Sequence, residues 1–203
     1  MRRASKRFWL LVSLLALTAL GFPSAQQANG LRRVSESTLA GFRPELDSIQ
    51  NAERVNRQHF HAFQRSLHQD GPDQTIESRL VWSDSCPKQE LTITAKNDVI
   101  QSVEVGSLAG SIDADCEING VPNPWKTGNG LSIGDPCRDV AAAYGNPDSE
   151  TASSKAAVKL ESYLYSFERT RTTAPQVMEV PCATSTQNVV EIKLTAASLH
   201  GIS

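Results

Sequence analysis

Apolar positions follow two different spacings along residues 39–112, and each spacing predicts a different kind of element. Between Pro44 and Pro72 they recur every three or four residues. This predicts a long helical region, or two helices with a break, that turns one face toward a core. The inward positions are Ile49, Ala52, Phe60, Phe63 and Leu67. Apolar and polar residues then alternate, which predicts three strands. These strands lie at residues 77–83, at residues 90–95 and around Ile100, Val103 and Val105.

The same order of patterns returns over residues 131–203, which indicates an internal repeat. Each copy opens with a Leu and a Pro five residues apart, and Pro suits the first helical turn, where its missing N–H would be unpaired anyway. Gly145 closes the second helix, which is much shorter than the first, and Asp135 is its expected N-cap. The opening pairs are Leu39 with Pro44 and Leu131 with Pro136. The later strands lie at residues 161–167, at residues 176–181 and around Val189, Ile192 and Leu194.

These patterns predict an α+β fold of two tandem units. Each unit is a helical region followed by a roughly three-stranded antiparallel sheet, with the helices on one face. The small residues 151–157 are expected to form a flexible loop inside the second unit. The predicted organisation is a signal peptide at 1–25, a flexible N-terminal segment at 26–38, a first unit at 39–112, a linker at 113–130 and a second unit at 131–203.

The first 25 residues have the layout of a secretory signal peptide. Arg2, Arg3, Lys6 and Arg7 precede an apolar run that ends in small residues before Gln26. The run is about 15 residues long, which is short for the roughly 20 that span a bilayer, although an uncleaved anchor remains an alternative. We therefore expect a secreted or periplasmic protein without a stable membrane anchor after signal cleavage.

Cysteine usage agrees with that compartment, because an even number of cysteines in a secreted protein indicates disulfides. The four cysteines are separated by 29, 20 and 44 residues, too widely for the C-x-x-C pairs typical of zinc sites. Three pairings of Cys86, Cys116, Cys137 and Cys182 are open. We favour Cys116 with Cys137, because both flank one loop rich in Gly, Pro and Asn, and this leaves Cys86 with Cys182.

Composition and charge narrow the class of protein. The 203 residues are 39% hydrophobic and 21% charged, which is ordinary for a globular protein. The net charge is −2 for the whole chain, and without the first 25 residues it becomes −6 from 16 basic and 22 acidic residues. This balance argues against a nucleic-acid binder, which normally carries a basic surplus.

Motifs for catalysis, cofactors or metals are not recognisable. The G-x-S-x-G nucleophile motif is absent, and the glycines near residue 130 do not match the dinucleotide fingerprint. His59, His61 and His68 lack the i, i+4 spacing of a helical metal site, so a solvated polar face is the default interpretation. We therefore predict no catalytic, cofactor-binding or metal-binding residues.

Aromatic side chains gather on equivalent predicted strands, although they make up only 6% of the chain. Alternation puts Tyr163, Tyr165 and Phe167 on one face. If that face is open, it suits a protein interface, where Tyr and Trp concentrate binding energy. The alternative is ordinary core with the tyrosine hydroxyls at its rim. The candidate partner-binding residues are Trp82, Tyr163, Tyr165 and Trp125, the last being either a plug between the units or an exposed contact.

A family resemblance lies in residues 130–195 and, more weakly, in residues 39–108. The run GLSIGDPCRDVAAAYGNPD, the Tyr-rich strand after it and NVVEIKL resemble the helix-and-sheet unit of the small outer-membrane assembly lipoproteins of the SmpA/OmlA (BamE) type. A tandem of such units resembles the β-lactamase inhibitor protein family. This chain has no lipobox Cys, and its long first helix and cysteine positions depart from the inhibitor branch. The resemblance therefore implies neither a lipid anchor nor β-lactamase inhibition, but a scaffold whose sheet face docks onto another protein.

The sequence thus predicts a secreted or periplasmic, non-catalytic protein-binding module without a cofactor. Its expected partner is another protein rather than a nucleic acid. Two other hypotheses stay open. One is a secreted hydrolase with a site between the two units, which requires a cleft lined by titratable groups. The other is a small-ligand carrier with a pocket between helices and sheet.

Overall fold

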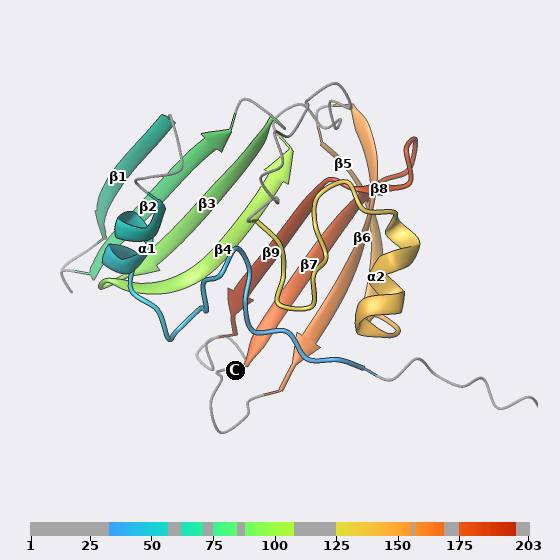
Figure 1. Cartoon of the computed structure of the whole chain (residues 1–203), viewed down its shortest axis with the longest axis horizontal. Coiled ribbons are helices and arrows are strands. Elements are labelled where there is room, and N and C mark those ends of the chain that lie inside the picture. Colours follow the sequence, from blue (N-terminus) through green and yellow to red (C-terminus); the bar gives the residue numbers. More distant parts are fainter. Residues whose placement is uncertain are drawn as a thin grey trace, which may run out of the picture. The chain divides into compact units, whose positions relative to one another are not determined.

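The computed structural model describes residues 33–56, 62–70, 75–84, 88–107, 125–155, 157–168 and 175–197 (Figure 1). Within these residues the chain forms helices α1 (Ile49–Asn56) and α2 (Cys137–Tyr144) and nine strands. The strands are β1 (Ala62–Asp70), β2 (Thr75–Asp84), β3 (Gln89–Lys96), β4 (Val99–Ser107), β5 (Ser149–Lys155), β6 (Val158–Phe167), β7 (Gln176–Ala183), β8 (Asn188–Val189) and β9 (Glu191–Ala196). The predicted signal peptide, residues 1–25, lies outside the described residues.

All nine strands belong to one antiparallel sheet, in the order β1-β2-β3-β4-β9-β7-β6-β5, with β8 added beside β7. The first four strands form a meander, the later strands return in the opposite order, and β4 pairs with β9 where the two halves meet (Figure 1). At this junction Val103 lies opposite Leu194 and Val105 opposite Ile192. The last strands of the two halves therefore join their apolar rows into a single core.

The prediction of two tandem units, each with its own three-stranded sheet, is wrong, because the strands form one continuous sheet with two short helices. Alternation identifies which residues of a strand face a core, but it does not say which strand edges pair. An isolated three- or four-stranded sheet would leave the last strand of each half with an unpaired edge. Pairing β4 with β9 satisfies both edges at once.

The long helical region expected between Pro44 and Pro72 is also wrong. Helix α1 has eight residues, and the strand β1 occupies residues 62–70. Phe63 and Leu67 are four residues apart, a spacing that places two positions on one face of either a helix or a strand. The pattern was therefore ambiguous, and pairing with β2 over the whole length of β1 decides it. Phe60 lies outside the described residues.

The loop expected at residues 151–157 is mostly strand. Residues up to Lys155 belong to β5, which pairs with β6 through seven successive residue pairs, and Ala157 lies in the turn between the two strands. The small residues that indicated a loop occupy an exposed edge strand, where little packing is demanded of the side chains. The other expected strands lie within the observed ones, residues 77–83 in β2 and 161–167 in β6.

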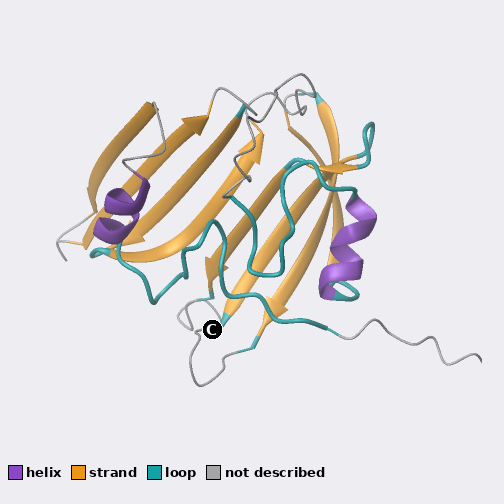
Figure 2. Ribbon diagram, in the orientation of Figure 1, coloured by secondary structure: helices purple, strands orange, loops and turns teal. Residues whose placement is uncertain are grey.

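One face of the sheet carries the core. Helix α1 contributes Ile49 and Ala52, and α2 contributes Val140 and Tyr144, to the same cluster of buried residues. The sheet side of that cluster includes Leu80, Trp82, Leu91, Ile93, Val103, Val105, Met178, Val180, Ile192 and Leu194. Both helices and the loops before them therefore lie on this face, here called the covered face (Figure 2).

Helix α2 ends where the sequence predicts, at a glycine. Gly145 has φ 81°, a conformation that glycine adopts without a Cβ penalty, and its N–H donates to the carbonyl of Ala141. Its start differs from the prediction. The N-cap residue is Pro136, and the side chain of Asp135 accepts a hydrogen bond from the Ser132 N–H instead of capping the helix.

Candidate functional site

The face of the sheet opposite the two described helices, here called the open face, is formed by alternate residues of β2, β3, β4, β9, β7 and β6. The strand register brings six of them into one row across the sheet, in the order Val81, Thr92, Glu104, Lys193, Glu179 and Leu164. Most of these side chains are half-buried, as expected for the middle of a sheet face. The row places charge at its centre and apolar side chains at its ends.

Two carboxylates flank one ammonium group at the middle of this row. Lys193 lies directly opposite Glu104 on one side and Glu179 on the other. Its Nζ is 3.5 Å from Oε2 of Glu104, and the two side chains are 41% and 30% exposed. This pair is open to solvent, so it adds little stability, but it marks a charged surface.

A second group of charges lies one row away. Glu90 and Glu191 lie on either side of Gly106, which has no side chain to separate them. Lys155 reaches this group from β5, and its Nζ donates to Oε2 of Glu191 over 2.6 Å. That hydrogen bond, followed by the charges of Glu191, Glu104 and Glu90, raises the pKa of Lys155. The ammonium of Lys155 therefore stays charged among three carboxylates.

A small apolar cluster adjoins these charges. Leu160, Ala183 and Val190 are buried together, and Val158 packs against them. Ala183 lies opposite Leu160 in the register, so both side chains belong to the open face and not to the main core. The cluster gives this part of the open face an apolar component beside its acidic groups.

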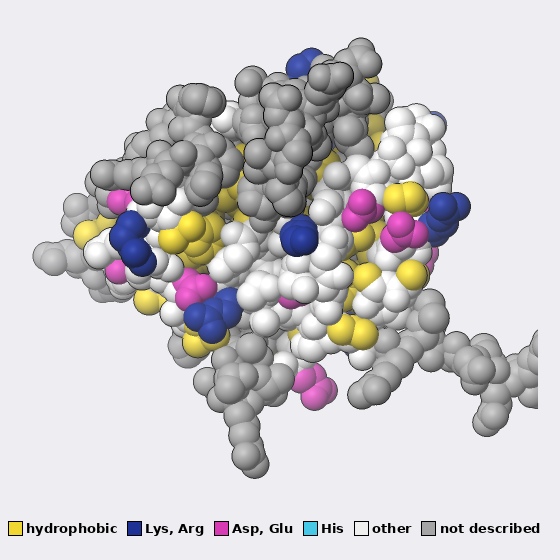
Figure 3. All heavy atoms as spheres, in the orientation of Figure 1, with side chains coloured by type: hydrophobic (Ala, Val, Ile, Leu, Met, Phe, Trp, Pro, Cys, Tyr) yellow, Lys and Arg dark blue, Asp and Glu magenta, His cyan; other side chains and the backbone are white. Residues whose placement is uncertain are grey.

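The structure places the predicted partner-binding aromatics on the covered face. Trp82, Tyr165 and Trp125 are 1%, 0% and 3% exposed and belong to the main core. Tyr163 is half-buried and donates its hydroxyl hydrogen to Glu161 over 3.3 Å. Ordinary core, the alternative that the sequence left open, therefore describes the three buried aromatics. Figure 3 views the molecule from this side, where acidic and basic side chains lie scattered among apolar ones.

The buried aromatic rings hold the N-terminal segment. Tyr165 stacks on Phe167 with 6.2 Å between ring centroids, and Tyr144 lies 5.6 Å from Tyr165. The guanidinium carbon of Arg33 is 5.7 Å from the centre of the Tyr165 ring, within cation–π distance. Burial raises the pKa of Tyr165 to about 12. Its hydroxyl donates to the carbonyl of Gly145 over 3.1 Å.

Glu36 is a buried carboxylate at the centre of a hydrogen-bond network. It is 3% exposed, and its Oε1 accepts from the N–H groups of Ser37 and Thr38 over 2.8 and 2.9 Å. Its Oε2 accepts from the N–H of Asn129 over 3.0 Å and from the hydroxyl of Tyr144 over 2.8 Å. Buried charge is tolerated when it is hydrogen-bonded in this way. The network therefore ties the N-terminal segment to the second half of the chain.

Residues 26–38 were expected to be flexible, yet the part of them that the structure describes is held at several points. Besides the Glu36 network, Nη1 of Arg33 lies 2.7 Å from Oδ1 of Asp148. Hydrogen bonding to Arg33 lowers the pKa of Asp148. Sequence reasoning missed Arg33 and Glu36, because the residues of the second half that they bind, Asp148 and Asn129, lie more than 90 positions away and no local pattern connects them.

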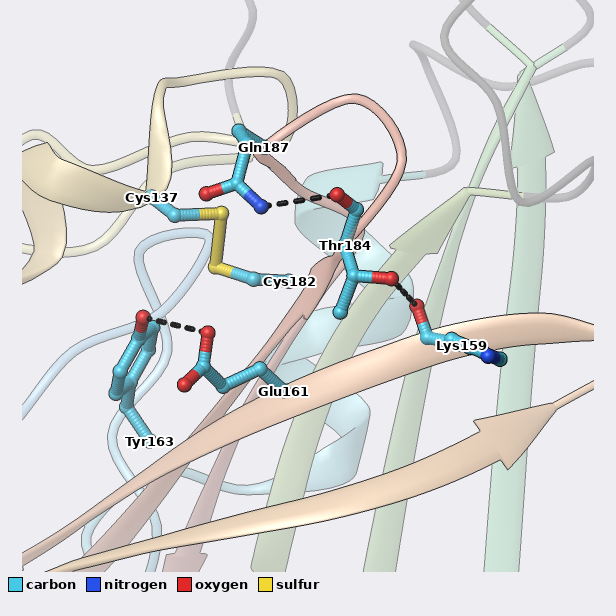
Figure 4. Close-up of a disulfide and its surroundings, with 7 residues drawn as sticks. All are labelled: Cys137, Lys159, Glu161, Tyr163, Cys182, Thr184 and Gln187. Atoms are coloured by element: carbon cyan, nitrogen blue, oxygen red, sulfur yellow. Dashed lines mark hydrogen bonds between the residues drawn. A yellow bond between two sulfur atoms is a disulfide. The ribbon is translucent and has the colours of Figure 1, made fainter.

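The disulfide prediction is confirmed for one bridge and wrong in its pairing (Figure 4). Cys137 at the start of α2 is bonded to Cys182 near the end of β7, with 6.0 Å between the Cα atoms. A hydrogen bond from the Cys137 N–H to the carbonyl of Gln187 holds the two segments together. Cys116–Cys137 and Cys86–Cys182 were expected, but both would need a cysteine that this bridge uses. Cys86 and Cys116 lie outside the described residues.

In the part of the chain that the structure describes, no three His, Cys, Asp or Glu side chains are grouped so that they could hold a metal ion. His59 and His61 lie outside that part, and His68 belongs to β1. The candidate site is the surface of charged and apolar side chains on the open face. The sequence contained a signal for it, because Glu104 and Lys193 alternate with the core residues of their strands.

Comparisons with known proteins do not assign this chain to a family. Neither a known protein family nor a curated protein matches it. One similar solved structure is a cysteine-rich secretory protein from Staphylococcus aureus subsp. aureus Mu50, with 12% identity and a TM-score of 0.38. The match covers 76% of this chain and 48% of that one, so the chain spans about half the length of that protein. The resemblance to the lipoprotein and inhibitor families stays an expectation.

Among the described residues, none of the helices has the length and apolar character needed to cross a bilayer. The Cys137–Cys182 bridge fits an oxidising compartment, where disulfides form and persist.

Proposed function

We propose that this chain is a secreted or periplasmic, non-catalytic protein-binding module whose open face docks onto a basic surface of another protein. The observation that carries the proposal is the surplus of carboxylates at the middle of that face. Four glutamates and two lysines converge there, namely Glu90, Glu104, Glu179, Glu191, Lys155 and Lys193. The excess of two negative charges favours a partner that presents Lys or Arg side chains.

Internal ion pairs neutralise part of this charge but leave a surplus. Lys193 faces Glu104, and Lys155 bonds to Glu191. Because there are two ammonium groups for four carboxylates, a basic partner gains attraction without competing for every internal pair. Charges on an exposed surface of this kind act mainly on the rate and specificity of association, and salt weakens them.

Apolar side chains supply the remaining contribution that a protein interface needs. Val81 and Leu164 lie at the two ends of the charged row, and Val177 lies beside it on β7. All three are half-buried, so a docked partner would remove their remaining apolar surface from water. Taken as a whole, a non-obligate interface is no more apolar than the rest of a protein surface, so charged groups between apolar ones are compatible with such an interface.

Site-specific photocrosslinking in intact cells tests the proposal. Benzoylphenylalanine replaces Val81 on the open face or, as a control, Arg138 on α2, whose side chain is 86% exposed on the covered side. We expect a defined protein adduct from position 81 and none from position 138. Reversing one charge, Glu179→Lys, should reduce the adduct by about tenfold, since a like charge opposes a basic partner. The matched reversal Asp139→Lys on α2 should not change it.

Equal crosslinking at positions 81 and 138 would contradict the proposal, because it would show that no particular face is used. If neither Glu179→Lys nor Glu104→Lys reduces the yield of the adduct, the proposal that the partner presents a basic surface is contradicted. The yield should also fall as salt is raised, since exposed ion pairs are screened over about 8 Å at physiological ionic strength.

A further inference from the structure

We infer that this chain pairs with a second copy of itself through the outer edge of β5. The strand is the last one of the sheet, and within the described residues it pairs with β6 alone. All seven of its residues, Ser149–Lys155, are exposed. An edge strand presents unpaired N–H and C=O groups, which are a ready template for another strand.

Natural sheets usually protect such an edge, and the described strand β5 contains neither a proline nor a β-bulge. Proteins protect edges with proline, with a β-bulge, with charged side chains, or by covering the edge with a helix or loop. The sequence of β5, SETASSK, contains no proline, and its register with β6 runs through seven consecutive pairs without a shift. Its two charges, on Glu150 and Lys155, are opposite and sum to zero. The edge is therefore regular, carries no net charge and has no large apolar side chain.

The geometry of the β5–β6 hairpin decides which backbone N–H and C=O groups of β5 point away from β6. Lys155 lies opposite Val158, so a two-residue connection joins β5 to β6. The residues that flank such a connection form a hydrogen-bonded pair, and hydrogen-bonded positions then alternate along the strand. By this alternation Glu150, Ala152 and Ser154 direct their N–H and C=O groups away from β6. These three residues are the ones that another strand can pair with.

The strand is complementary to itself. An antiparallel pair centred on Ala152 places that residue opposite Ala152 of the second copy. It then places Glu150 opposite Ser154 and Ser149 opposite Lys155, so no like charges meet. Outward-facing residues meet outward-facing residues throughout, which allows the full ladder of hydrogen bonds. The symmetry is a two-fold axis perpendicular to the sheet, the commonest symmetry of protein dimers.

The zero net charge of β5 favours a second copy of this chain, rather than a charged peptide, as the strand that pairs with its outer edge. A strongly acidic or strongly basic peptide would gain nothing from a strand of zero net charge, whereas self-pairing uses the small central residues and separates the charged ones. The two-fold axis keeps the open faces of both copies on the same side of the extended sheet. Self-pairing does not require the proposed protein partner, because it uses the edge of the sheet and not its face.

Register-specific disulfide trapping tests the inference on the purified full-length protein. In the proposed pair, the two Ala152 Cα atoms lie about 5.5 Å apart, within the range that a disulfide bridges. The two Glu150 Cα atoms are four residues out of register and therefore more than about 13 Å apart. Under mild oxidation, Ala152→Cys should give at least about tenfold more covalent dimer than Glu150→Cys, because a disulfide tolerates only the shorter distance. Peptide mapping should place the new link between the two substituted positions.

Sedimentation of the protein without added cysteines provides the second measurement. We expect a monomer–dimer equilibrium that Ala152→Pro shifts toward monomer, because proline removes an outward N–H while leaving the pairing with β6 intact. Glu179→Lys, which tests the open face, should leave this equilibrium unchanged, so the two proposals can fail separately. Equal covalent dimer from Ala152→Cys and Glu150→Cys would overturn the inference, as would a monomer at all concentrations.

Discussion

Tyr144 on α2 donates its hydroxyl hydrogen to Glu36, a residue 108 positions earlier in the chain, over 2.8 Å. Glu36 can only accept, so the hydroxyl of Thr127, 2.6 Å from the tyrosine oxygen, donates to that oxygen in turn. The N–H of Leu131 then donates to the Thr127 oxygen over 3.0 Å. This chain of hydrogen bonds locks the N-terminal segment, the loop before α2 and α2 itself into one buried unit.

Removal of the Tyr144 hydroxyl should destabilise the protein. In Tyr144→Phe, Glu36 loses one donor and Thr127 loses its acceptor in a buried site, which costs about 1–3 kcal/mol. The free energy of unfolding from urea titration measures this loss. Tyr163→Phe is the matched control, because its hydrogen bond to Glu161 spans 3.3 Å at a half-buried position. The control should change stability by less than about 0.5 kcal/mol, and equal losses would contradict the role of the network.

Two glycines should respond in opposite ways to the same substitution. A Cβ on Gly128 would lie 2.5 Å from Oγ1 of Thr38 and 2.7 Å from Oε1 of Glu36. Gly128→Ala therefore has to push the Glu36 network apart, with an expected loss of about 1–3 kcal/mol. A Cβ on Gly106 would meet Glu191 at 3.7 Å, an ordinary contact. Gly106→Ala should be neutral or stabilise by up to about 1 kcal/mol, because alanine suits a strand interior better.

Thermal or urea unfolding of the two glycine variants, measured side by side, checks this prediction. If Gly128→Ala is as stable as the unsubstituted protein, then residues 33–38 do not pack against the loop before α2 as described. Loss of stability in both variants would instead show that alanine is unfavourable at the β4 position as well.

The sequence predicts faces of the sheet better than it predicts how the strands are joined. Alternation around Val103 and Val105, and around Ile192 and Leu194, identifies the residues that face the core. The pairing of β4 with β9 depends on two edges more than 80 residues apart, and no local pattern records which edges meet. Phe63 shows a second limit of prediction from sequence. Its four-residue spacing from Leu67 fits one face of either a helix or a strand, so the pattern alone does not distinguish the two kinds of element.

The same limit applies to the candidate site. Glu104 and Lys193 could be placed opposite the core by alternation, but their direct pairing follows only from the joined sheet. The buried position of Glu36 had no local signal, because its network reaches Asn129 and Tyr144 through the tertiary fold. The alternation along the aromatic strand fitted both an exposed binding face and ordinary core. The burial of Tyr165 in the core decides between these two interpretations.

Alkaline pH should destabilise the protein through Tyr165. Burial raises its pKa to about 12 in the folded state, whereas an unfolded tyrosine titrates near 10. The folded state thus holds its proton more tightly, so this contribution is complete below about pH 10 and is lost as pH rises toward about 12. The free energy of unfolding should fall by about 2 kcal/mol across this interval, since each unit of pKa corresponds to about 1.4 kcal/mol.

Urea titrations at several pH values from neutral to alkaline measure this loss, and Tyr165→Phe provides the comparison. The variant lacks the titrating group, so its stability should decline less steeply above pH 10, although burial also raises the pKa of Tyr144. Parallel pH profiles for the two proteins would show that Tyr165 does not carry the effect.

The Cys137–Cys182 bridge should be detected directly and should stabilise the fold. Non-reducing peptide mapping is expected to find the peptide that links these two cysteines, and a peptide that links Cys116 to Cys137 would contradict the structure. The bridge joins residues 45 positions apart, so the chain-entropy estimate of its stabilisation is roughly 4 kcal/mol. The double variant Cys137→Ala/Cys182→Ala removes the bridge without leaving a free thiol, and it should lower the urea midpoint accordingly. Because the bridge anchors the start of α2 to β7, its loss should also loosen Tyr144 and weaken the hold on Glu36. The added effect of Tyr144→Phe should therefore be smaller in the double variant than in the intact protein.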